Sequence, residues 1–332
     1  MELSVPSWPG QLTAIGDRKI FIRHAGAEGD PVLCVHGLEG ASTNWTDLMA
    51  ELTGEYSLDA MDLPGFGYSP PPATAAGYSV TSQAEAIAAT IEQHVGGPVH
   101  LIGNSLGGAA SLRVAARRPE LVRTLTLVSP VLPDRWPHWE LSRFPLLCVP
   151  GLGGWLMRRA AAITPEQRVR AVAAFVFHDP SAIAPERLAA EAAEMTRRDG
   201  LGHGGVAMVA TLRSLIAEMY GAALWRDASR VSAPALLIFG SHDRLVDPRL
   251  AGRASRAFAG SKVLVLPRTG HVAQMEHPAI VAREWTRWVR GLRVYTAIRQ
   301  GVRTSVAATV GRTGRRPFRR RGAPLLAPPD HP

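Results

Sequence analysis

Short apolar runs alternate with helix-forming segments along most of this 332-residue chain. Six runs have the length and composition of buried strands: 31–35, 57–61, 98–102, 122–128, 235–239 and 262–266. The segments between and after them favour helices near 44–52, 80–94, 105–117, 248–258 and 277–290. Such alternation predicts a parallel sheet with helices on both faces. A hairpin predicted over 12–24 adds two strands, so we expect a mostly parallel sheet of about eight strands.

The alternation stops between about 131 and 205. In this stretch the pattern indicates only helices, at roughly 152–162, 165–178 and 185–198. Pro165 and Pro185 stand at first-turn positions, where a missing N–H costs nothing. The sequence therefore predicts an all-helical insertion after the sixth strand of the sheet.

Residues 103–107 read Gly-Asn-Ser-Leu-Gly, directly after a predicted strand and at the start of a predicted helix. A serine on so sharp a turn has a strained backbone, and the glycines on either side let strand and helix pass closely. Ser105 is therefore a candidate nucleophile. The five-residue pattern alone is weak evidence, because it also arises by chance, so neighbouring segments must support it.

Three further predicted strands run into loops with polar side chains. The strand 31–35 leads into His36-Gly37-Leu38-Glu39-Gly40, the strand 235–239 into a loop with Asp243, and the strand 262–266 into a loop with His271. In open parallel sheets, ligands bind beyond the carboxyl ends of the strands. We expect these loops to meet Ser105 at that edge.

With these residues in order, the chain resembles the α/β-hydrolase fold superfamily over about residues 11–290, in its esterase- and lipase-like serine hydrolase branch. Segments 62–69 and 270–278 carry further matches. The resemblance implies an α/β fold whose core domain comprises 1–130 and 206–290. It also identifies 131–205 as a helical cap that covers the site and excludes water.

The resemblance assigns a catalytic triad in the family's order of Ser, Asp or Glu, then His. Ser105 would be the nucleophile, His271 the general base, and Asp243 the residue that orients the imidazole. Asp247 and Asp134 are alternatives for the acid, since some members place it after the sixth strand.

Other members of the site follow from the same resemblance. The backbone N–H groups of Leu38 and Leu106 would form the oxyanion hole. His36, Gly37, Glu39 and Asn104 would line the site, with His36 supporting the oxyanion loop rather than reacting. The chain has 11 histidines, and His36, His242 and His277 compete with His271 for the role of base; its place after the last strand favours His271.

The leading interpretation is a serine hydrolase that cleaves a small, apolar carboxylic ester or thioester through an acyl-enzyme. Ser105 argues against the dehalogenase and epoxide hydrolase branches, which use Asp there. The alternative is a carbon–carbon bond hydrolase of ring-cleavage products, although Val272 replaces their usual Trp and residues 36–40 lack their extended Gly-rich loop. A haloperoxidase or acyltransferase would use the same triad, and a non-catalytic binding protein is the alternative of another class. No metal or organic cofactor is implied.

The net charge of +9 is concentrated at the C-terminal end. Segment 291–332 holds nine arginines and one acid, Asp330, which accounts for +8 of the +9. Its arginines, glycines and prolines predict a disordered tail, above all from Gly311 onward. Residues 291–310 could instead extend the last helix, although Arg299 interrupts the apolar face of such a helix. This segment is interpreted as a solvated tail without a partner or as a peripheral contact with an anionic membrane; nucleic acid is the least favoured partner.

Two features bear on the compartment. The first residues carry neither a basic n-region nor an apolar h-region, and no run of 18 apolar residues occurs. We therefore expect a cytoplasmic protein, with peripheral contact at the inner membrane face as a hypothesis. Cys34 and Cys148 form no disulfide framework or metal-ligand spacing, and we assign them no role.

Overall fold

A computed structural model describes residues 6–26, 28–134, 139–202 and 204–313. Its strands form one 8-stranded sheet in the order β1-β2-β4-β3-β5-β6-β7-β8. The strands are β1 (Gly10–Ile15), β2 (Arg18–Ala25), β3 (Asp30–Val35), β4 (Tyr56–Met61), β5 (Val99–Asn104), β6 (Val122–Val128), β7 (Ala235–Gly240) and β8 (Lys262–Leu266). All eight predicted strands are confirmed, with small differences at their ends.

The sheet is antiparallel only at one edge, where β2 pairs with β1 and β4. Every other pair is parallel, from β4 and β3 through β5, β6 and β7 to β8. All six residues of β5 and of β7 are buried, as expected of strands covered on both faces. The predicted fold class, a mostly parallel sheet between helices, is confirmed.

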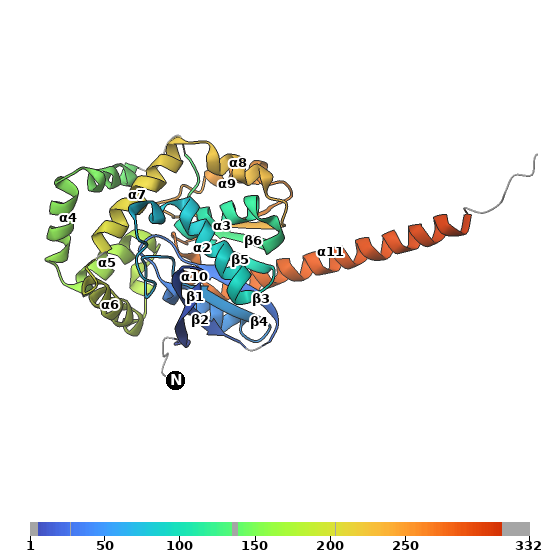
Figure 1. The fold of residues 1–332 in the computed structure, drawn as a ribbon, viewed down its shortest axis with the longest axis horizontal. Helices are drawn as coiled ribbons and strands as arrows, with labels where there is room; N and C mark the ends of the chain where they lie inside the picture. The colour runs from blue at the N-terminus through green and yellow to red at the C-terminus, as the bar shows by residue number, and fades with distance from the viewer. Residues whose placement is uncertain (1–5, 27, 135–138, 203, 314–332) are drawn as a thin grey trace, which may run out of the picture. The chain divides into compact units, whose positions relative to one another are not determined.

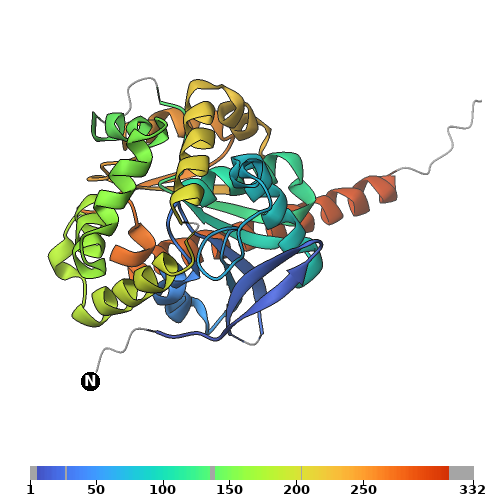
Figure 2. The same ribbon diagram turned by 60° about the vertical axis from the view of Figure 1, so that its left-hand side comes forward.

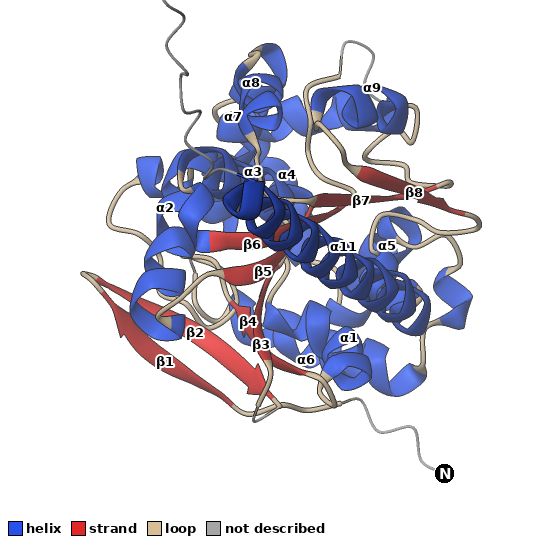
Figure 3. Ribbon diagram, turned by 90° about the vertical axis from the view of Figure 1, so that its right-hand side faces the viewer, coloured by secondary structure: helices blue, strands red, loops and turns tan. Residues whose placement is uncertain are grey.

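Helices lie on both sides of this sheet (Figure 3). The α-helices are α1 (Thr46–Leu52), α2 (Val80–Thr90), α3 (Ser105–Arg117), α4 (Leu152–Ala161), α5 (Pro165–Val176), α6 (Pro185–Asp199), α7 (Gly204–Tyr220), α8 (Ala223–Arg230), α9 (Leu250–Ala257), α10 (Ala273–Glu276) and α11 (Pro278–Thr313). The 3₁₀- and π-helical segments are η1 (Ser42–Trp45), η2 (Ala75–Tyr78), η3 (Ile91–Val95), η4 (Pro119–Leu121), η5 (Trp139–Cys148) and η6 (Pro180–Ala182). Helix α3 packs against β5 and β6 and also contacts α2 and α8. These contacts fix the residues at the N-terminus of α3.

The predicted helical insertion after β6 is present as η5, α4, α5, η6 and α6 (Figure 1). These elements, green to olive in Figure 2, gather on one side of the sheet. Pro165 and Pro185 occupy the first turns of α5 and α6, and the Thr164 hydroxyl caps α5 by accepting the Gln167 N–H. We call this segment the cap from here on.

The chain divides into two compact units, Met1–Arg283 and Glu284–Pro332. The cap and the sheet belong to the first, so the boundary between core and cap stays a prediction. In the second unit α11 continues to Thr313, which agrees with the alternative that residues 291–310 extend the last helix. No proline interrupts the sequence between Pro278 and Pro317, which permits the helix to continue. The rest of the expected tail, 314–332, lies outside the described residues.

No single helix in the described part of the chain is long and apolar enough to cross a membrane.

Candidate active site

Ser105 stands where β5 ends and α3 begins, and its backbone is left-handed with φ of 54°. A non-glycine residue rarely adopts this conformation, and one that does so in a sharp turn is held there by its surroundings. The turn is tight because Gly107 lies against β3: a Cβ added there would meet the Val35 carbonyl oxygen at 2.5 Å. Ser105 is buried, with 9% of its surface exposed to solvent.

The loops after β7 and β8 bring Asp243 and His271 into direct contact. His271 Nδ1 lies 2.9 Å from Asp243 Oδ2 and 3.1 Å from Oδ1. The same carboxylate accepts the N–H groups of Leu245 and Val246, at 2.8 and 3.0 Å. Burial disfavours the charged carboxylate, but His271 and the two N–H donors outweigh burial and lower the pKa of Asp243. The carboxylate of Asp243 therefore favours its ionised form and binds Nδ1 of His271, so that Nε2 is not engaged by Asp243.

Asn104 connects this pair to the nucleophile turn. Its side-chain Nδ2 donates to the main-chain oxygen of His271 at 3.1 Å and to that of Val128 at 3.0 Å. The residue next to Ser105 thus fixes the His271 backbone at the end of β5. No hydrogen bond joins the Ser105 hydroxyl to the His271 ring within the described residues, so the structure brings together two of the three predicted triad side chains by direct contact.

The loop after β3 lies against Ser105. A Cβ on Gly37 would come within 3.0 Å of the Ser105 Cβ and 3.1 Å of Asn104 Oδ1, so only glycine allows this approach. The main chain of Leu38, which follows Gly37, and that of Leu106, which follows Ser105, therefore flank the nucleophile turn. This placement agrees with their predicted part as oxyanion donors, which stays a prediction.

His36 is buried and supports this loop. Its Nδ1 lies 2.7 Å from the Gly37 carbonyl oxygen, and its Nε2 accepts the Leu63 N–H at 2.9 Å. These two bonds require a neutral ring with its proton on Nδ1. Burial lowers the pKa of His36, in keeping with the neutral form. Both ring nitrogens are occupied, which matches a supporting role for His36.

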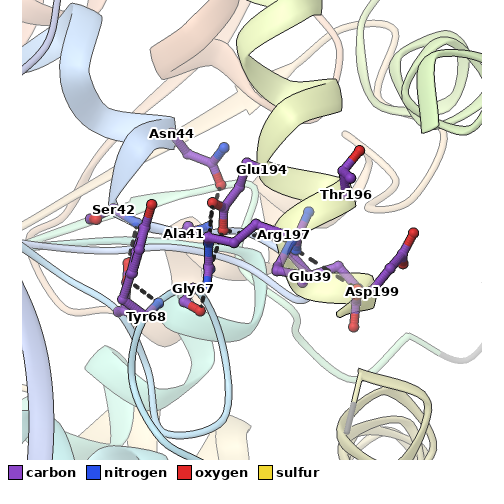
Figure 4. A network of polar contacts seen from close by, with 12 residues as sticks. Glu39, Ala41, Ser42, Asn44, Gly67, Tyr68, Glu194, Thr196, Arg197 and Asp199 are labelled. Atoms are coloured by element: carbon purple, nitrogen blue, oxygen red, sulfur yellow. Dashed lines mark hydrogen bonds and ion pairs between the residues drawn. The ribbon is translucent and has the colours of Figure 1, made fainter. Parts of the chain in front are cut away.

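Glu39 is the point at which the cap contacts this loop (Figure 4). Arg198 of α6 donates to the Glu39 main-chain oxygen at 2.5 Å, and its guanidinium lies 3.8 Å from the Glu39 carboxylate. Glu39 has a left-handed backbone, with φ of 58°. Desolvation raises the pKa of Glu39, against the opposing effect of Arg198, although 39% of the Glu39 side chain remains exposed.

Neighbouring Arg197 contacts a second loop in the same view. It donates to the Gly67 main-chain oxygen at 2.6 Å, and its guanidinium lies 3.7 Å from the centre of the Tyr68 ring (Figure 4). Buried Asp62 links the two loops, since it accepts the N–H groups of Ser42 and Tyr68 at 2.5 and 2.8 Å. Sequence analysis missed these arginines, because nothing in the sequence of α6 shows which loops it meets.

The alternative site residues have other partners. Asp247 accepts the main-chain N–H of Arg249 at 2.8 Å and pairs with its guanidinium. The His242 ring lies 4.1 Å from that of His178 in the cap, centre to centre, and His277 lies 3.3 Å from the Arg268 main-chain oxygen. Sequence analysis also gave no role to Glu276, which bonds on both sides of the cap boundary, as described below.

Two further features bear on ligand binding, namely the grouping of metal-ligating side chains and a surface cavity. Among the described residues, no group of three or more His, Cys, Asp or Glu side chains is placed to hold a metal ion. A surface cavity of about 660 Å³ lies between η2, α4 and α7 and is lined mainly by small apolar residues, with Arg213 as its one charged lining residue. None of the predicted site residues lines it, so the catalytic hypothesis does not depend on this cavity.

Comparison with known proteins identifies the family of this fold. The family model of the alpha/beta hydrolase fold matches residues 30–278. Lipase 3 of Moraxella sp. (strain TA144) is 25% identical, covering 84% of both chains. A pimeloyl-[acyl-carrier protein] methyl ester esterase of Neisseria meningitidis is 26% identical, covering 79% of this chain and 94% of the relative.

Among solved structures, a haloalkane dehalogenase variant from Bradyrhizobium elkanii superposes with a TM-score of 0.74. It is 24% identical and covers 88% of this chain and all of the dehalogenase, so the likeness concerns the fold alone. The match to the family model spans six of the eight strands, β3 to β8, together with the cap and the loops at the site. The chain therefore belongs to the alpha/beta hydrolase fold family and is a hydrolase.

Proposed function

We propose that this hydrolase cleaves carboxylic esters through an acyl-enzyme on Ser105, with His271 as general base and Asp243 as its partner. The observation that carries the proposal is the His271–Asp243 hydrogen bond at 2.9 Å, held next to the Ser105 turn by Asn104. Contacts between a nucleophile and its base often tighten only when substrate is bound. The lack of a direct Ser105–His271 bond is thus compatible with this chemistry.

In the first half-reaction, the Ser105 hydroxyl oxygen attacks the ester carbonyl carbon while His271 Nε2 takes its proton. The tetrahedral oxyanion would be bound by the N–H groups of Leu38 and Leu106. Asp243 stabilises the imidazolium that forms. Collapse breaks the bond to the alcohol, which leaves with the proton from His271, and the acyl group stays on Ser105 as an ester.

In the second half-reaction, water attacks the acyl carbonyl carbon as His271 takes one of its protons. The second tetrahedral intermediate collapses, the carboxylic acid leaves, and the proton returns to the Ser105 oxygen. The enzyme is regenerated without a cofactor. The same residues therefore serve both steps, with His271 alternating between base and acid.

The names of the relatives support an ester as the substrate. The two related proteins are named a lipase and a methyl ester esterase, which points to small-molecule esters. Ser105 favours this chemistry over that of the dehalogenase, because the family's dehalogenases use Asp at this position. Val272 after His271 also favours ester cleavage over carbon–carbon bond cleavage, for which Trp is usual there.

The test is hydrolysis of p-nitrophenyl esters of graded chain length by the wild type and by Ser105→Ala and His271→Ala. We expect each variant to lose at least about 10⁴ in kcat, because triad members act as a unit. A fluorophosphonate probe should label the wild type and not Ser105→Ala. Ser229→Ala, in an exposed part of α8, is the matched control and should behave as the wild type. Activity of Ser105→Ala within tenfold of the wild type would refute the proposal.

For the basic segment 291–332, we propose peripheral contact with an anionic membrane from the cytoplasmic side, because it carries +8 of the net charge. Each Lys or Arg near such a surface contributes about 1 kcal/mol. Co-sedimentation with vesicles of anionic phospholipid should retain the full chain and not the 1–290 fragment. Equal binding of both would exclude this role.

A further inference from the structure

The cap lies directly against the loop that carries His271. The His271 main-chain N–H donates to the Val176 main-chain oxygen, at the end of α5, with a distance of 2.7 Å. A Cβ on Gly270 would meet that same oxygen at 2.5 Å and the His178 nitrogen at 2.7 Å. The two main chains therefore pass so closely that only glycine fits at 270.

Glu276 bonds to both sides of this contact. Its Oε1 accepts the Gly270 N–H at 2.7 Å, and its Oε2 accepts the His178 N–H at 2.9 Å. Gly270 immediately precedes His271, whereas His178 belongs to the cap. One carboxylate at the end of α10 thus satisfies an N–H donor in the catalytic loop and another in the cap segment 176–178.

The loop that carries Asp243 meets the same part of the cap. The ring of His242, the residue before Asp243, lies against the ring of His178. Arg244, the residue after Asp243, donates to the Ala174 main-chain oxygen of α5 at 2.6 Å. The cap residues 174–178 therefore contact the neighbours of both Asp243 and His271, and through them the two loops are held in one arrangement.

We propose that Glu276 is a positioning residue: by joining Gly270 to His178, it couples docking of the cap to the alignment of the His271 ring with Asp243. This inference rests on the proposed function. Glu276 acts through main-chain groups and does not touch the reacting atoms. Without its carboxylate, two partly buried N–H donors lose their acceptor, and the His271 loop loses the link that Glu276 makes to the cap segment.

The test compares Glu276→Gln and Glu276→Ala with the wild type. Gln keeps the shape but replaces one acceptor oxygen with an NH2 donor, which opposes one of the two N–H groups. An N–H donor without its acceptor no longer holds the His271 loop in place, so we expect kcat to fall about tenfold in Glu276→Gln and further in Glu276→Ala. KM for a short p-nitrophenyl ester should change less than about twofold, since Glu276 makes no contact with substrate.

A second measurement does not depend on activity. Amide hydrogen exchange should show faster exchange at Gly270 and His178 in both variants, with unchanged protection in β5 and β7. Glu120→Gln, an exposed glutamate paired with Arg118, is the matched control and should change neither kcat nor exchange at these amides.

The outcomes separate the two proposals. If Ser105→Ala is inactive but Glu276→Gln retains full kcat, the positioning role is refuted while the proposed function stands. Faster exchange with full activity would confine Glu276 to a structural contact, and unchanged exchange would show that it joins nothing; either result overturns the inference. If the wild type neither hydrolyses esters nor reacts with the fluorophosphonate, the proposed function itself fails and the positioning role falls with it.

Discussion

At the residue scale, Ser105 combines a reactive side chain with a backbone that serine does not favour. Its φ of 54° falls in the left-handed region, which costs a non-glycine residue roughly 1–2 kcal/mol. The close approach of α3 and β3 at Gly107 enforces this conformation. Packing in the folded state therefore offsets the cost of the left-handed backbone at Ser105.

This strain predicts a difference between two inactive variants. Ser105→Gly and Ser105→Ala both remove the hydroxyl, but only glycine adopts the left-handed backbone without steric cost. We expect Ser105→Gly to be more stable than Ser105→Ala by about 1 kcal/mol in denaturant-induced unfolding. Equal stabilities, or a more stable alanine variant, would show that the turn is not strained.

Asp243 gives a pH dependence at the same scale. Its pKa is lower in the folded protein than the unfolded value of about 3.9, so its ionised form stabilises the fold. That contribution is complete above the unfolded pKa and is lost as the pH falls through the folded pKa. The difference in the free energy of unfolding between wild type and Asp243→Asn should stay constant from neutral pH down to about pH 5 and shrink below about pH 4. Denaturant titrations from pH 3 to pH 7 would measure it; a difference that grows in acid has the wrong sign.

At the scale of elements, α6 determines how the cap meets the loops after β3 and β4. Three arginines project from it: Arg187 pairs with Asp47 and contacts Thr46, while Arg197 and Arg198 bond main-chain oxygens of the two loops. Because Arg197 and Arg198 bind main-chain oxygens, the helix positions the backbone of each loop as well as neutralising nearby charge. Leu38 lies between Gly37, which contacts Ser105, and Glu39, which contacts Arg198.

Arg198→Met should therefore impair catalysis more than stability. Methionine keeps the aliphatic stem and the helix propensity but loses the bond to the Glu39 carbonyl. We expect kcat for p-nitrophenyl esters to fall about tenfold, less than the 10²–10³ typical when an oxyanion donor is lost entirely. The melting temperature should change little, because the pair is partly exposed. Arg197→Met is the matched control on the same helix, and an equal loss of kcat there would argue against a specific effect on Leu38.

At the scale of the whole molecule, a buried ion cluster joins the nucleophile helix to the helices that follow the cap. Arg113 of α3 is 2% exposed and bonds both carboxylate oxygens of Glu218 on α7, at 2.6 and 2.9 Å. It also donates to Asp227 on α8 at 3.0 Å and to the Thr81 hydroxyl at 3.1 Å. One side chain thus connects α2, α3, α7 and α8 within the first unit.

Arg113→Met should destabilise the protein by about 3–5 kcal/mol, because it leaves buried Asp227 and partly buried Glu218 without their cation. Chemical denaturation at neutral pH would measure this change. Arg118→Met is the matched control: Arg118 also pairs with two glutamates, but at the surface, and its loss should change stability little. Comparable losses in the two variants would mean that burial of the cluster is not what makes it important.

Much of this molecule follows from local patterns. Runs of apolar residues predict six of the eight strands, because strands buried on both faces must be apolar along their whole length. The places of Ser105, Asp243 and His271 after three of the parallel strands predict one site, because parallel strands present their carboxyl ends at the same edge. Two features could not be settled from local patterns. One is the course of residues 291–310, for which the sequence allowed either a disordered tail or an extension of the last helix; in the structure α11 continues to Thr313.

The contacts of the cap could be found only in three dimensions. Arg198 and Glu276 are ordinary helix residues in the sequence, and their partners Glu39 and His178 lie 159 and 98 positions away. Hydrophobic periodicity specifies which face of a helix is buried but not which main-chain oxygen or N–H it meets. The sequence by itself therefore determined the sheet and named the candidate catalytic side chains, whereas the tertiary structure decided what holds them, because hydrogen bonds between distant segments exist only after the elements have packed.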